Sequence, residues 1–194
     1  MTHIVGIGGT TKPASSTELA LRLALDSARQ AGAEVTLFDG AFLVALPHYG
    51  TGDCAAPDIA RFVDTIRSAD GVIIASPGYH GSVSGLVKNA IDYIEQTATD
   101  PRVYLDGVPV GLIATAYGWA ATGSTMSTMR AIVHALRGWP TPLGAGIKST
   151  PGLFTEDGCT DPKVAAQLLL VGRQVQEFAQ LRRDRPNIID TGPQ

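Results

Sequence analysis

The chain has 194 residues, of which 44% are hydrophobic and 17% charged, and its formal net charge is −3. This composition supplies enough apolar surface for a buried core and excludes a disordered chain. The sequence lacks a basic block, which excludes the electrostatic footprint of a nucleic-acid-binding protein. Two cysteines, Cys54 and Cys159, are too few and too far apart for a disulfide framework or a zinc site.

The hydropathy pattern and the N-terminal residues indicate where in the cell the protein is expected. Apolar runs stay shorter than a membrane span, and the N-terminus leads straight into a strand-like segment rather than into the basic and long apolar regions of a signal peptide. Because no stretch resembles a linker, we predict one domain over residues 1–194, with a polar, loosely held tail from about Arg182. We therefore expect a soluble, cytoplasmic protein that binds neither membranes nor nucleic acid.

Short apolar segments alternate along the chain with longer amphipathic ones. Five strands are predicted, at residues 3–8, 34–38, 71–76, 108–116 and 143–148. The first helix is predicted from Ser15 to about Ala31, and four more are marked by apolar stripes at residues 59–66, 87–94, 126–136 and 164–178. Residues 39–57, rich in Gly, Pro and Ala, are predicted as a long and therefore functional loop.

Five repeats of strand followed by helix predict parallel strands joined by right-handed crossovers, with helices on both faces of the sheet. At this length the expected fold class is α/β, a three-layer α/β/α flavodoxin-like arrangement around a five-stranded parallel sheet. Ligands of such sheets bind outside the carboxyl ends of the strands. The loops that follow the first, third and fourth predicted strands are therefore the candidate binding loops.

The first of these loops, residues 8–17, has neither the G-x-G-x-x-G spacing of a dinucleotide site nor the G-K-[ST] ending of a nucleotide P-loop. It offers a glycine pair, hydroxyl side chains and the cation of Lys12 just before a helix, and these groups suit a phosphate monoester. The alternative is purely structural: Ser15 or Ser16 caps the helix and Glu18 completes a capping box. The residues alone leave both interpretations open.

The other two loops carry glycines and aromatic residues. Residues 76–82 place backbone amides around Tyr79, an arrangement that can hydrogen-bond a flat heterocycle, although tight turns also use Pro-Gly. Residues 116–124 carry Tyr117 and Trp119, which can flank a ligand, stabilise a dimer or simply pack against the fold.

At these loops the sequence resembles the NADPH-dependent FMN reductase family of flavodoxin-like proteins. Residues 9–17, GTTKPASST, resemble the family's phosphate loop, G-S-x-R-x-x-S-x-N/T. Residues 76–93, SPGYHGSVSGLVKNAIDY, resemble P-E-Y-x-x-S-x-P-G-x-L-K-N-x-x-D-W, and residues 118–123 are similar to the third flavin loop. Together with the order of elements, the resemblance covers residues 3 to about 180.

The resemblance implies FMN as cofactor, NADPH or NADH as hydride donor, and a set of residues around the flavin. It implies a phosphate site made by Thr10, Lys12, Ser15, Ser16 and Thr17. It implies a ring site made by Pro77, Gly78, Tyr79, His80 and Gly81, mainly through backbone groups, and by Tyr117, Gly118 and Trp119. The cluster of Lys88, Asn89 and Asp92 is interpreted as structural, tying its helix to neighbouring segments.

The chain departs from the family pattern at four positions. Thr10 replaces a serine and keeps the hydroxyl, whereas Lys12 replaces an arginine and loses bidentate phosphate geometry. Gly78 stands where a glutamate is common, and Ser84 where a proline is. The weaker phosphate contact favours FMN as a dissociable substrate.

The resemblance implies an NAD(P)H:FMN oxidoreductase that passes hydride from NADPH or NADH to FMN, the reduced flavin then going to a partner monooxygenase or another acceptor. The alternatives are an FMN-bound quinone, azo or metal-oxyanion reductase, and a flavodoxin-like electron carrier. A hydrolase is least supported, because the G-x-S-x-G pattern does not occur. Since the cofactor carries the chemistry, we name no catalytic residue and no metal, with a proton shuttle at His80 as the minority interpretation.

A homodimer or homotetramer is expected. Met126, Met129, Trp119 and Trp139 offer apolar surface for it. The alternative, slightly favoured for the two methionines, is that they belong to the core stripe of their own helix.

Overall fold

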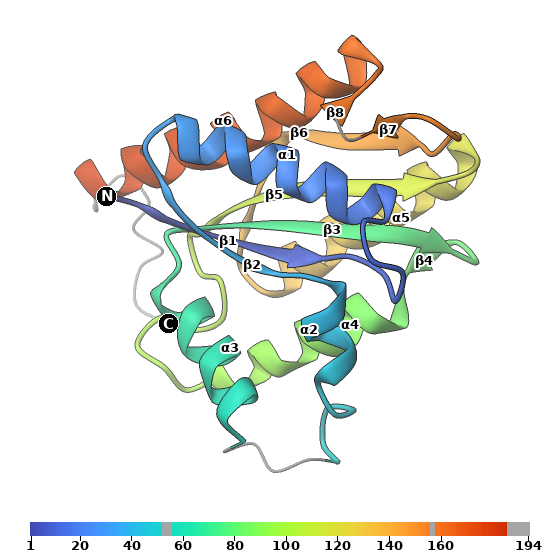
Figure 1. Ribbon diagram of the computed structural model, residues 1–194. Coiled ribbons are helices and arrows are strands. Elements are labelled where there is room, and N and C mark those ends of the chain that lie inside the picture. The colour runs from blue at the N-terminus through green and yellow to red at the C-terminus, as the bar shows by residue number, and fades with distance from the viewer. Residues whose placement is uncertain (52–55, 156–157, 186–194) are drawn as a thin grey trace.

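The computed structural model describes residues 1–51, 56–155 and 158–185. Its main sheet has five parallel strands in the order β2-β1-β3-β5-β6, which is the flavodoxin-like order and confirms the predicted fold class (Figure 1). The strands are β1 (His3–Gly8), β2 (Glu34–Phe38), β3 (Gly71–Tyr79), β5 (Pro109–Ala116) and β6 (Trp139–Lys148). A short sixth strand, β4 (Ser82–Val83), pairs with the end of β3.

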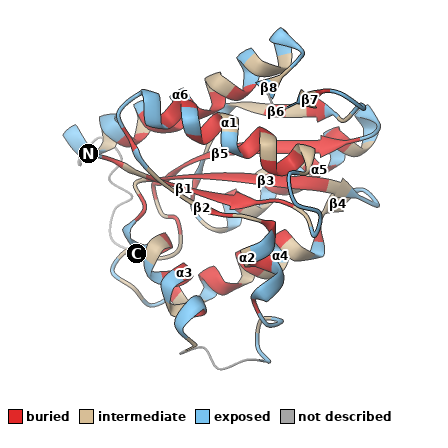
Figure 2. Ribbon diagram, in the orientation of Figure 1, coloured by how far each residue is buried: buried red, intermediate tan, exposed pale blue. Residues whose placement is uncertain are grey.

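Helices cover both faces of the sheet. In Figure 1, α1 (Ser16–Gln30) and α6 (Pro162–Asp184) lie on one face, and α2 (Gly40–Ala45), α3 (Pro57–Ser68), α4 (Gly85–Asp92) and α5 (Trp119–Ala135) on the other. Each face has its own buried apolar cluster. The central strands β3 and β5 are buried along almost their whole length (Figure 2), as expected of continuous apolar runs covered on both sides.

Side-chain caps begin several of the helices. The Ser15 hydroxyl accepts a hydrogen bond from the Glu18 backbone N–H at α1, and the Asp161 carboxylate accepts from the backbone of Lys163 and Val164 at α6. Ser84 does the same for α4, where its hydroxyl accepts from the Val87 N–H. These caps satisfy N–H groups that a helix cannot pair internally.

The structure differs from the predicted elements in four places. The predicted loop 39–57 contains α2, which begins at an Asp39 cap but is too short to show a helical periodicity. The strand β3 runs three residues further than expected and turns back into β4. Strand β6 begins at Trp139 rather than at residue 143, and its position at the edge of the sheet tolerates Pro140 and Pro142. After Asp92 the chain continues as a 3-10 helix, η1 (Tyr93–Thr97).

The C-terminal part also differs in detail. A small hairpin of β7 (Phe154–Thr155) and β8 (Gly158–Cys159) precedes α6. The helix α6 continues to Asp184, so the tail predicted from Arg182 starts as helix, and its remainder from residue 186 lies outside the described residues, as does Cys54. Within the described ranges, none of the helices is both long and apolar enough to cross a membrane.

Candidate functional site

The three candidate loops meet at one edge of the sheet. Strands β1, β3 and β5 are direct neighbours and parallel, so their carboxyl ends face the same way, toward the right of Figure 1. The register pairs Gly8 with Ala75 and Pro77 with Thr115, which places the loop after β1 beside the last residues of β3 and the end of β5. The three loops, which are separate in the sequence, therefore lie next to one another at this edge.

The β1–α1 loop is held by backbone contacts that only glycine permits. A Cβ on Gly9, whose φ is +131°, would lie 2.6 Å from the Gly40 nitrogen, and a Cβ on Gly40 would lie 2.0 Å from the Thr10 carbonyl oxygen. The start of α2 therefore backs directly onto this loop. Because the space between the two segments is too narrow for a side chain, the loop is fixed against the start of α2, and we call this loop, residues 9–17, the cradle.

Hydroxyl and cationic groups occupy the rest of this loop. The Thr10 hydroxyl accepts a hydrogen bond from the Lys12 backbone N–H and donates one to the Lys12 carbonyl, each at 3.1 Å. The Lys12 side chain is exposed. Ala14 has a φ of 51°, a left-handed conformation that costs a non-glycine residue about 1 kcal/mol. This local turn holds Lys12 at the rim of the cradle.

At the start of α1 the structural interpretation of the sequence is confirmed in part. Ser15 is the cap, since its hydroxyl lies 3.3 Å from the Glu18 N–H. The Glu18 carboxylate binds Arg22, at 2.7 Å, instead of reaching back to complete a capping box. Arg22 also lies 3.3 Å from the Asp39 carboxylate, which caps α2. The negative charge of Glu18, beside the candidate phosphate loop, is therefore paired.

The next two residues differ in accessibility. Ser16 is partly exposed in the first turn of α1, where backbone N–H groups have no acceptor within the helix. Thr17 is 2% exposed, and its hydroxyl lies 2.6 Å from the Thr115 hydroxyl of β5. This buried pair joins the phosphate-loop helix to the strand that leads into the third loop.

The second loop is a two-residue β-hairpin. Tyr79 pairs with Ser82, and the two residues between them, His80 and Gly81, have φ values of 49° and 88°, as in a type I′ turn. Pro77 is buried in the strand, whereas Tyr79 is 54% exposed and His80 lies at the exposed tip. The hairpin thus projects an aromatic ring and an imidazole beyond the edge of the sheet.

A buried serine fixes the base of the hairpin. The Ser76 hydroxyl accepts from the Ser84 N–H at 3.0 Å and donates to the Pro77 carbonyl. Ser84, which stands where the family has a proline, in turn caps α4. The hydroxyl cap thus gives the start of this helix an interaction that a proline could not make.

The third loop is the most exposed. Tyr117 is 86% and Trp119 66% exposed, and Gly118 between them is the N-cap of α5. Both aromatic rings therefore project from the end of β5 rather than pack into the core. Of the residues that the sequence singles out for a dimer, Met129 is 2% exposed and belongs to the core, as the alternative interpretation predicted, and Trp139 is 47% exposed.

The Lys88, Asn89 and Asp92 cluster is structural, as predicted. Lys88 pairs with Asp92 one turn along α4, at 2.6 Å. The Asn89 side chain accepts from the Tyr49 N–H at 2.8 Å and donates to the Pro47 carbonyl at 2.9 Å. Asn89 therefore ties α4 to the segment that follows α2.

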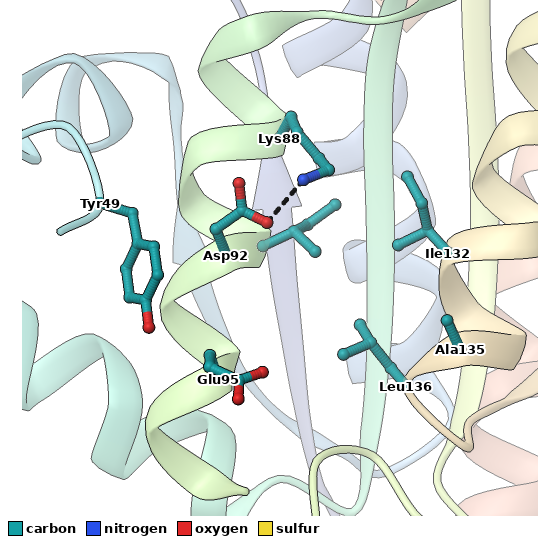
Figure 3. Close-up of a pocket in the computed structure, with 8 residues that line it drawn as sticks. Tyr49, Lys88, Asp92, Glu95, Ile132, Ala135 and Leu136 are labelled. Carbon is teal, nitrogen blue, oxygen red and sulfur yellow. Dashed lines mark hydrogen bonds and ion pairs between the residues drawn. The ribbon is translucent and has the colours of Figure 1, made fainter.

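A hollow of about 270 Å³ lies between α4 and α5, away from the strand ends (Figure 3). Its lining combines an apolar floor with a few charged residues at the rim. It comprises Tyr49, Lys88, Ile91, Asp92, Glu95, Ile132, Ala135 and Leu136. At its edge the Tyr104 hydroxyl donates to the Glu95 carboxylate at 3.0 Å, and this hydrogen bond raises the pKa of Tyr104. This α4–α5 groove is a surface feature separate from the three loops.

Sequence reasoning did not find the part that α2 and Arg22 play at the loop after β1. Gly40 makes the closest contact with Thr10, and Asp39 carries both the α2 cap and the Arg22 pair. A helix-capping Asp followed by Gly directly after a predicted strand was the available signal. It was obscured because the whole stretch was read as one loop.

Comparison with known proteins identifies the family. Residues 2–149 match the NADPH-dependent FMN reductase family, and the chain belongs to it. This confirms the resemblance seen in the sequence, and the family's description names both FMN and NADPH.

Two curated relatives are FMN-dependent NADPH-azoreductases of staphylococci. That of Staphylococcus haemolyticus (strain JCSC1435) is 32% identical over 101 residues, which is 52% of this chain and 50% of the relative. That of Staphylococcus aureus (strain USA300) is 34% identical over 91 residues, which is 47% of this chain and 45% of the relative. The chain thus spans about half the length of the curated relatives it matches.

Solved structures support the fold. FerB, an NAD(P)H:(acceptor) oxidoreductase from Paracoccus denitrificans, aligns with a TM-score of 0.75 and 22% identity, covering 93% of this chain and 98% of its own. The apo form of the NADH:FMN oxidoreductase EMOB aligns with a TM-score of 0.70 and 23% identity, covering 93% and 90%. At these identities the likeness shows a shared flavodoxin-like fold.

The residues at the strand ends fit FMN. The Gly9–Gly40 contact fixes the backbone of the loop after β1, and the exposed groups of that loop are the hydroxyls and the ammonium that a phosphate monoester requires. Beyond the cradle, the hairpin and the third loop expose aromatic rings suited to a flat heterocycle.

Proposed function

We propose that this protein is an NADPH- or NADH-dependent FMN reductase whose flavin site is the edge formed by the loops after β1, β3 and β5. The observation that carries this proposal is the convergence of a phosphate-type cradle and two aromatic loops at the ends of three adjacent parallel strands. Membership of the FMN reductase family supports the same reading.

In this proposal the first loop binds the phosphate of FMN. The ammonium of Lys12 supplies charge, and the Ser15 hydroxyl, which only accepts in its cap, donates a hydrogen bond. The Thr10 hydroxyl donates to the phosphate in place of the Lys12 carbonyl. The unpaired first-turn N–H groups of Ser16 and Thr17 face the anion. The Thr17 side chain contributes indirectly, because its hydroxyl holds α1 against Thr115. This division explains why one residue of the set is buried.

The second and third loops orient the ring. The backbone of residues 77–81 presents amide groups to the polar edge of a heterocycle, and Tyr79 lies against its rim. Tyr117, Gly118 and Trp119 close the other side. FMN, when bound, supplies the hydride-accepting ring, so the chain's own residues bind, orient and exclude water. We assign no side chain to proton transfer.

A spectral titration tests this proposal. We expect the purified protein to quench the fluorescence of added FMN in a saturable way, and Lys12→Ala to raise the Kd about tenfold through loss of one charged contact. Arg173→Ala, which removes a positive charge from the middle of α6, is the matched control and is expected to leave the Kd unchanged. Absence of any change in FMN fluorescence at saturating protein would overturn the flavin assignment.

The same protein is then tested for turnover. Oxidation of NADPH or NADH, followed by absorbance loss at the reduced-nicotinamide band, is expected to depend on added FMN. FMN binding without pyridine-nucleotide oxidation would instead favour the flavodoxin-like electron carrier. Weakly bound FMN would make reduced flavin a diffusible product, which we propose is passed to a partner monooxygenase in the cytoplasm, where reduced pyridine nucleotides are available.

A second candidate function is azo reduction with retained FMN, favoured by the names of the curated relatives. It predicts a yellow protein as isolated and loss of azo-dye colour with NADPH in the absence of added flavin. A colourless preparation that bleaches dye only with excess FMN would favour the flavin reductase. Quinones and metal oxyanions are tested as acceptors in the same assay.

We also propose a homodimer built on the α4–α5 groove, with a homotetramer as its further assembly. Lys88 and Glu95 both line the groove, seven residues apart. A two-fold axis between them would pair Lys88 of each copy with Glu95 of the other copy. Sedimentation equilibrium of the protein and of Ile132→Glu tests this. The substitution is expected to yield monomers, and a monomeric parent protein would contradict the dimer.

A further inference from the structure

Lys148 is the last residue of β6, so it lies at the same edge of the sheet as the three loops, next to the end of β5 and farthest from the loop after β1. Its backbone pairs with Ala116, and the Ser149 N–H donates to the Ala116 carbonyl at 2.7 Å. Since β3 and β5 pair Pro77 with Thr115, Lys148 stands level with Ala116 and with the residue after Pro77. The edge therefore runs from Lys12 after β1, past β3 and β5, to Lys148 on β6.

The side of the sheet that Lys148 faces follows from its neighbours. Ile147 is buried in the cluster beneath α1 and α6, so the residue after it belongs to the opposite face, that of α5. Gly144 of β6 lies against Met126 of α5, and Gly146 lies against Thr122. Moving two residues forward along β6 therefore moves the contact four residues toward the start of α5. The same step takes Lys148 to Gly118, between Tyr117 and Trp119.

This corner combines charge with exposed aromatic surface. Lys148 is exposed, Tyr117 is 86% and Trp119 66% exposed. Within residues 1–51, 56–155 and 158–185, the Lys148 ammonium has neither an ion-pair nor a hydrogen-bond partner. A cation beside a flat ring is complementary to a nucleotide, in which a phosphate is joined to a planar base.

The spacing along the edge separates this corner from the FMN phosphate site. Strands β3 and β5 lie between β1 and β6, so Lys148 is about three strand spacings, or roughly 14 Å, from the end of β1. A phosphate held by Lys12 is therefore out of reach of Lys148. The ammonium of Lys148, unpaired among the described residues, is therefore available to a second anionic ligand.

We propose that Lys148 and Trp119 bind the phosphorylated adenosine half of the reducing pyridine nucleotide, with a phosphate on the ammonium and the adenine against the face of the indole turned away from the flavin. This inference rests on the proposed function, because it places the co-substrate of the same site. It assigns the hydride donor an approach from the β6 side of the flavin, opposite the FMN phosphate.

The two tryptophans of the chain make the test direct. Trp139 begins β6, nine residues and about 30 Å from Lys148, so replacing it leaves the proposed site intact. In Trp139→Phe, Trp119 is the only tryptophan, and all tryptophan fluorescence comes from it. In this variant, titration with adenosine 2′,5′-bisphosphate is expected to quench Trp119 fluorescence saturably. Adding Lys148→Ala is expected to raise the Kd about tenfold, and adding Arg173→Ala to leave it unchanged.

Two further probes identify which phosphate is bound. Tighter binding of adenosine 2′-monophosphate than of the 5′-monophosphate assigns Lys148 to the 2′-phosphate and predicts a preference for NADPH, whereas the reverse order assigns it to the pyrophosphate and predicts similar use of NADH. Unquenched Trp119 fluorescence, or equal Kd values for the Lys148→Ala and Arg173→Ala proteins, would overturn the proposal.

The outcome is independent of the flavin experiment. FMN titration of the same variants reports on Lys12 and the cradle, and Lys148→Ala is expected to bind FMN as the parent does. FMN binding with no adenosine-phosphate binding would therefore refute the Lys148 site and leave the reductase proposal standing. Adenosine-phosphate binding without FMN binding would support a nucleotide site at Lys148 but overturn the reductase proposal, and with it the assignment of that nucleotide as hydride donor.

Discussion

Gly78 lies directly against the Thr125 hydroxyl of α5: a Cβ on Gly78 would stand 2.6 Å from Thr125 Oγ1. Thr125 is buried, and its hydroxyl donates to the Ser82 carbonyl at 3.3 Å. The contact explains why glycine occupies a position where the family commonly has glutamate. In this chain α5 closes over the base of the hairpin and leaves no space for a side chain.

Gly78→Ala is therefore expected to lower the free energy of unfolding by about 1–3 kcal/mol through overpacking. The double variant Gly78→Ala/Thr125→Ala should lose less than the two single variants together, because the clash is gone. Urea denaturation measures all three. Gly123→Ala, also on α5 but with open space around its Cβ position, is the control and should be neutral or stabilising. Additive losses in the double variant would contradict a direct contact.

The Thr17 and Thr115 hydroxyls form a second coupled pair. Thr115→Val leaves the buried Thr17 hydroxyl without its partner and is expected to cost about 1–3 kcal/mol. Removing both hydroxyls, in Thr17→Val/Thr115→Val, should recover part of that loss. Measuring FMN affinity on the same proteins separates roles: a Kd that rises only with Thr17→Val would assign its hydroxyl to the ligand rather than to Thr115.

His80 occupies the first position of the type I′ turn, at a φ of 49°. Asparagine adopts this conformation more readily, so His80→Asn is expected to raise the free energy of unfolding by about 0.5–1 kcal/mol. Because we assign His80 no proton transfer, turnover with NADPH should be unchanged. Steady-state kinetics across pH 5.5–8 checks this. A tenfold fall in kcat, with a lost pH inflection, would show that the imidazole moves a proton.

Asn89 is expected to be a strong structural residue although it is partly exposed. Asn89→Ala removes the hydrogen bonds to Tyr49 and Pro47 and should cost about 1–3 kcal/mol. Lys88→Ala, on the preceding residue, removes within one copy of the chain an exposed pair with Asp92 and should lower the stability of that copy by less than about 1 kcal/mol. Hydrogen exchange gives a local readout, since the Tyr49 amide should lose protection in the first variant only.

Lys12→Arg restores the residue common in the family. The planar guanidinium can bind a phosphate through two parallel hydrogen bonds, so FMN affinity is expected to rise about tenfold. Retention of flavin through gel filtration and a fluorescence titration measure the change. An unchanged Kd would mean that Lys12 lies too far from the bound phosphate for its geometry to matter.

The strands and the loop positions could be predicted because they depend on local patterns. The apolar run 34–38 coincides with β2, and the Ser15 cap coincides with the start of α1. The start of β6 was predicted four residues too late. The tolerance of Pro140 and Pro142 in this strand depends on its position at the edge of the sheet, which is a property of the assembled sheet. The turn of β3 into β4 was missed for a related reason, as His80-Gly81 is an uncommon type I′ pair.

The candidate site was predictable as a set of loops but not as a set of contacts. The pairing of Thr17 with Thr115 joins residues 98 positions apart, and that of Gly9 with Gly40 joins two segments that the sequence shows only as separate turns. Such contacts arise from the packing of α1, α2 and β5. Lys148 was overlooked because its strand lies one position beyond the three candidate loops.

The close approach of Gly9, Thr10 and Gly40 divides the edge into a part that is hard to alter and a part that is free to vary. Where main chain touches main chain, any added methyl group forces two segments apart, so this corner should resist diversification. The rings of Tyr79, Tyr117 and Trp119 lean into solvent and support little of the core. Libraries restricted to those three positions should therefore yield mostly folded proteins, in which acceptor preference can be screened while the proposed anchor for the flavin stays intact.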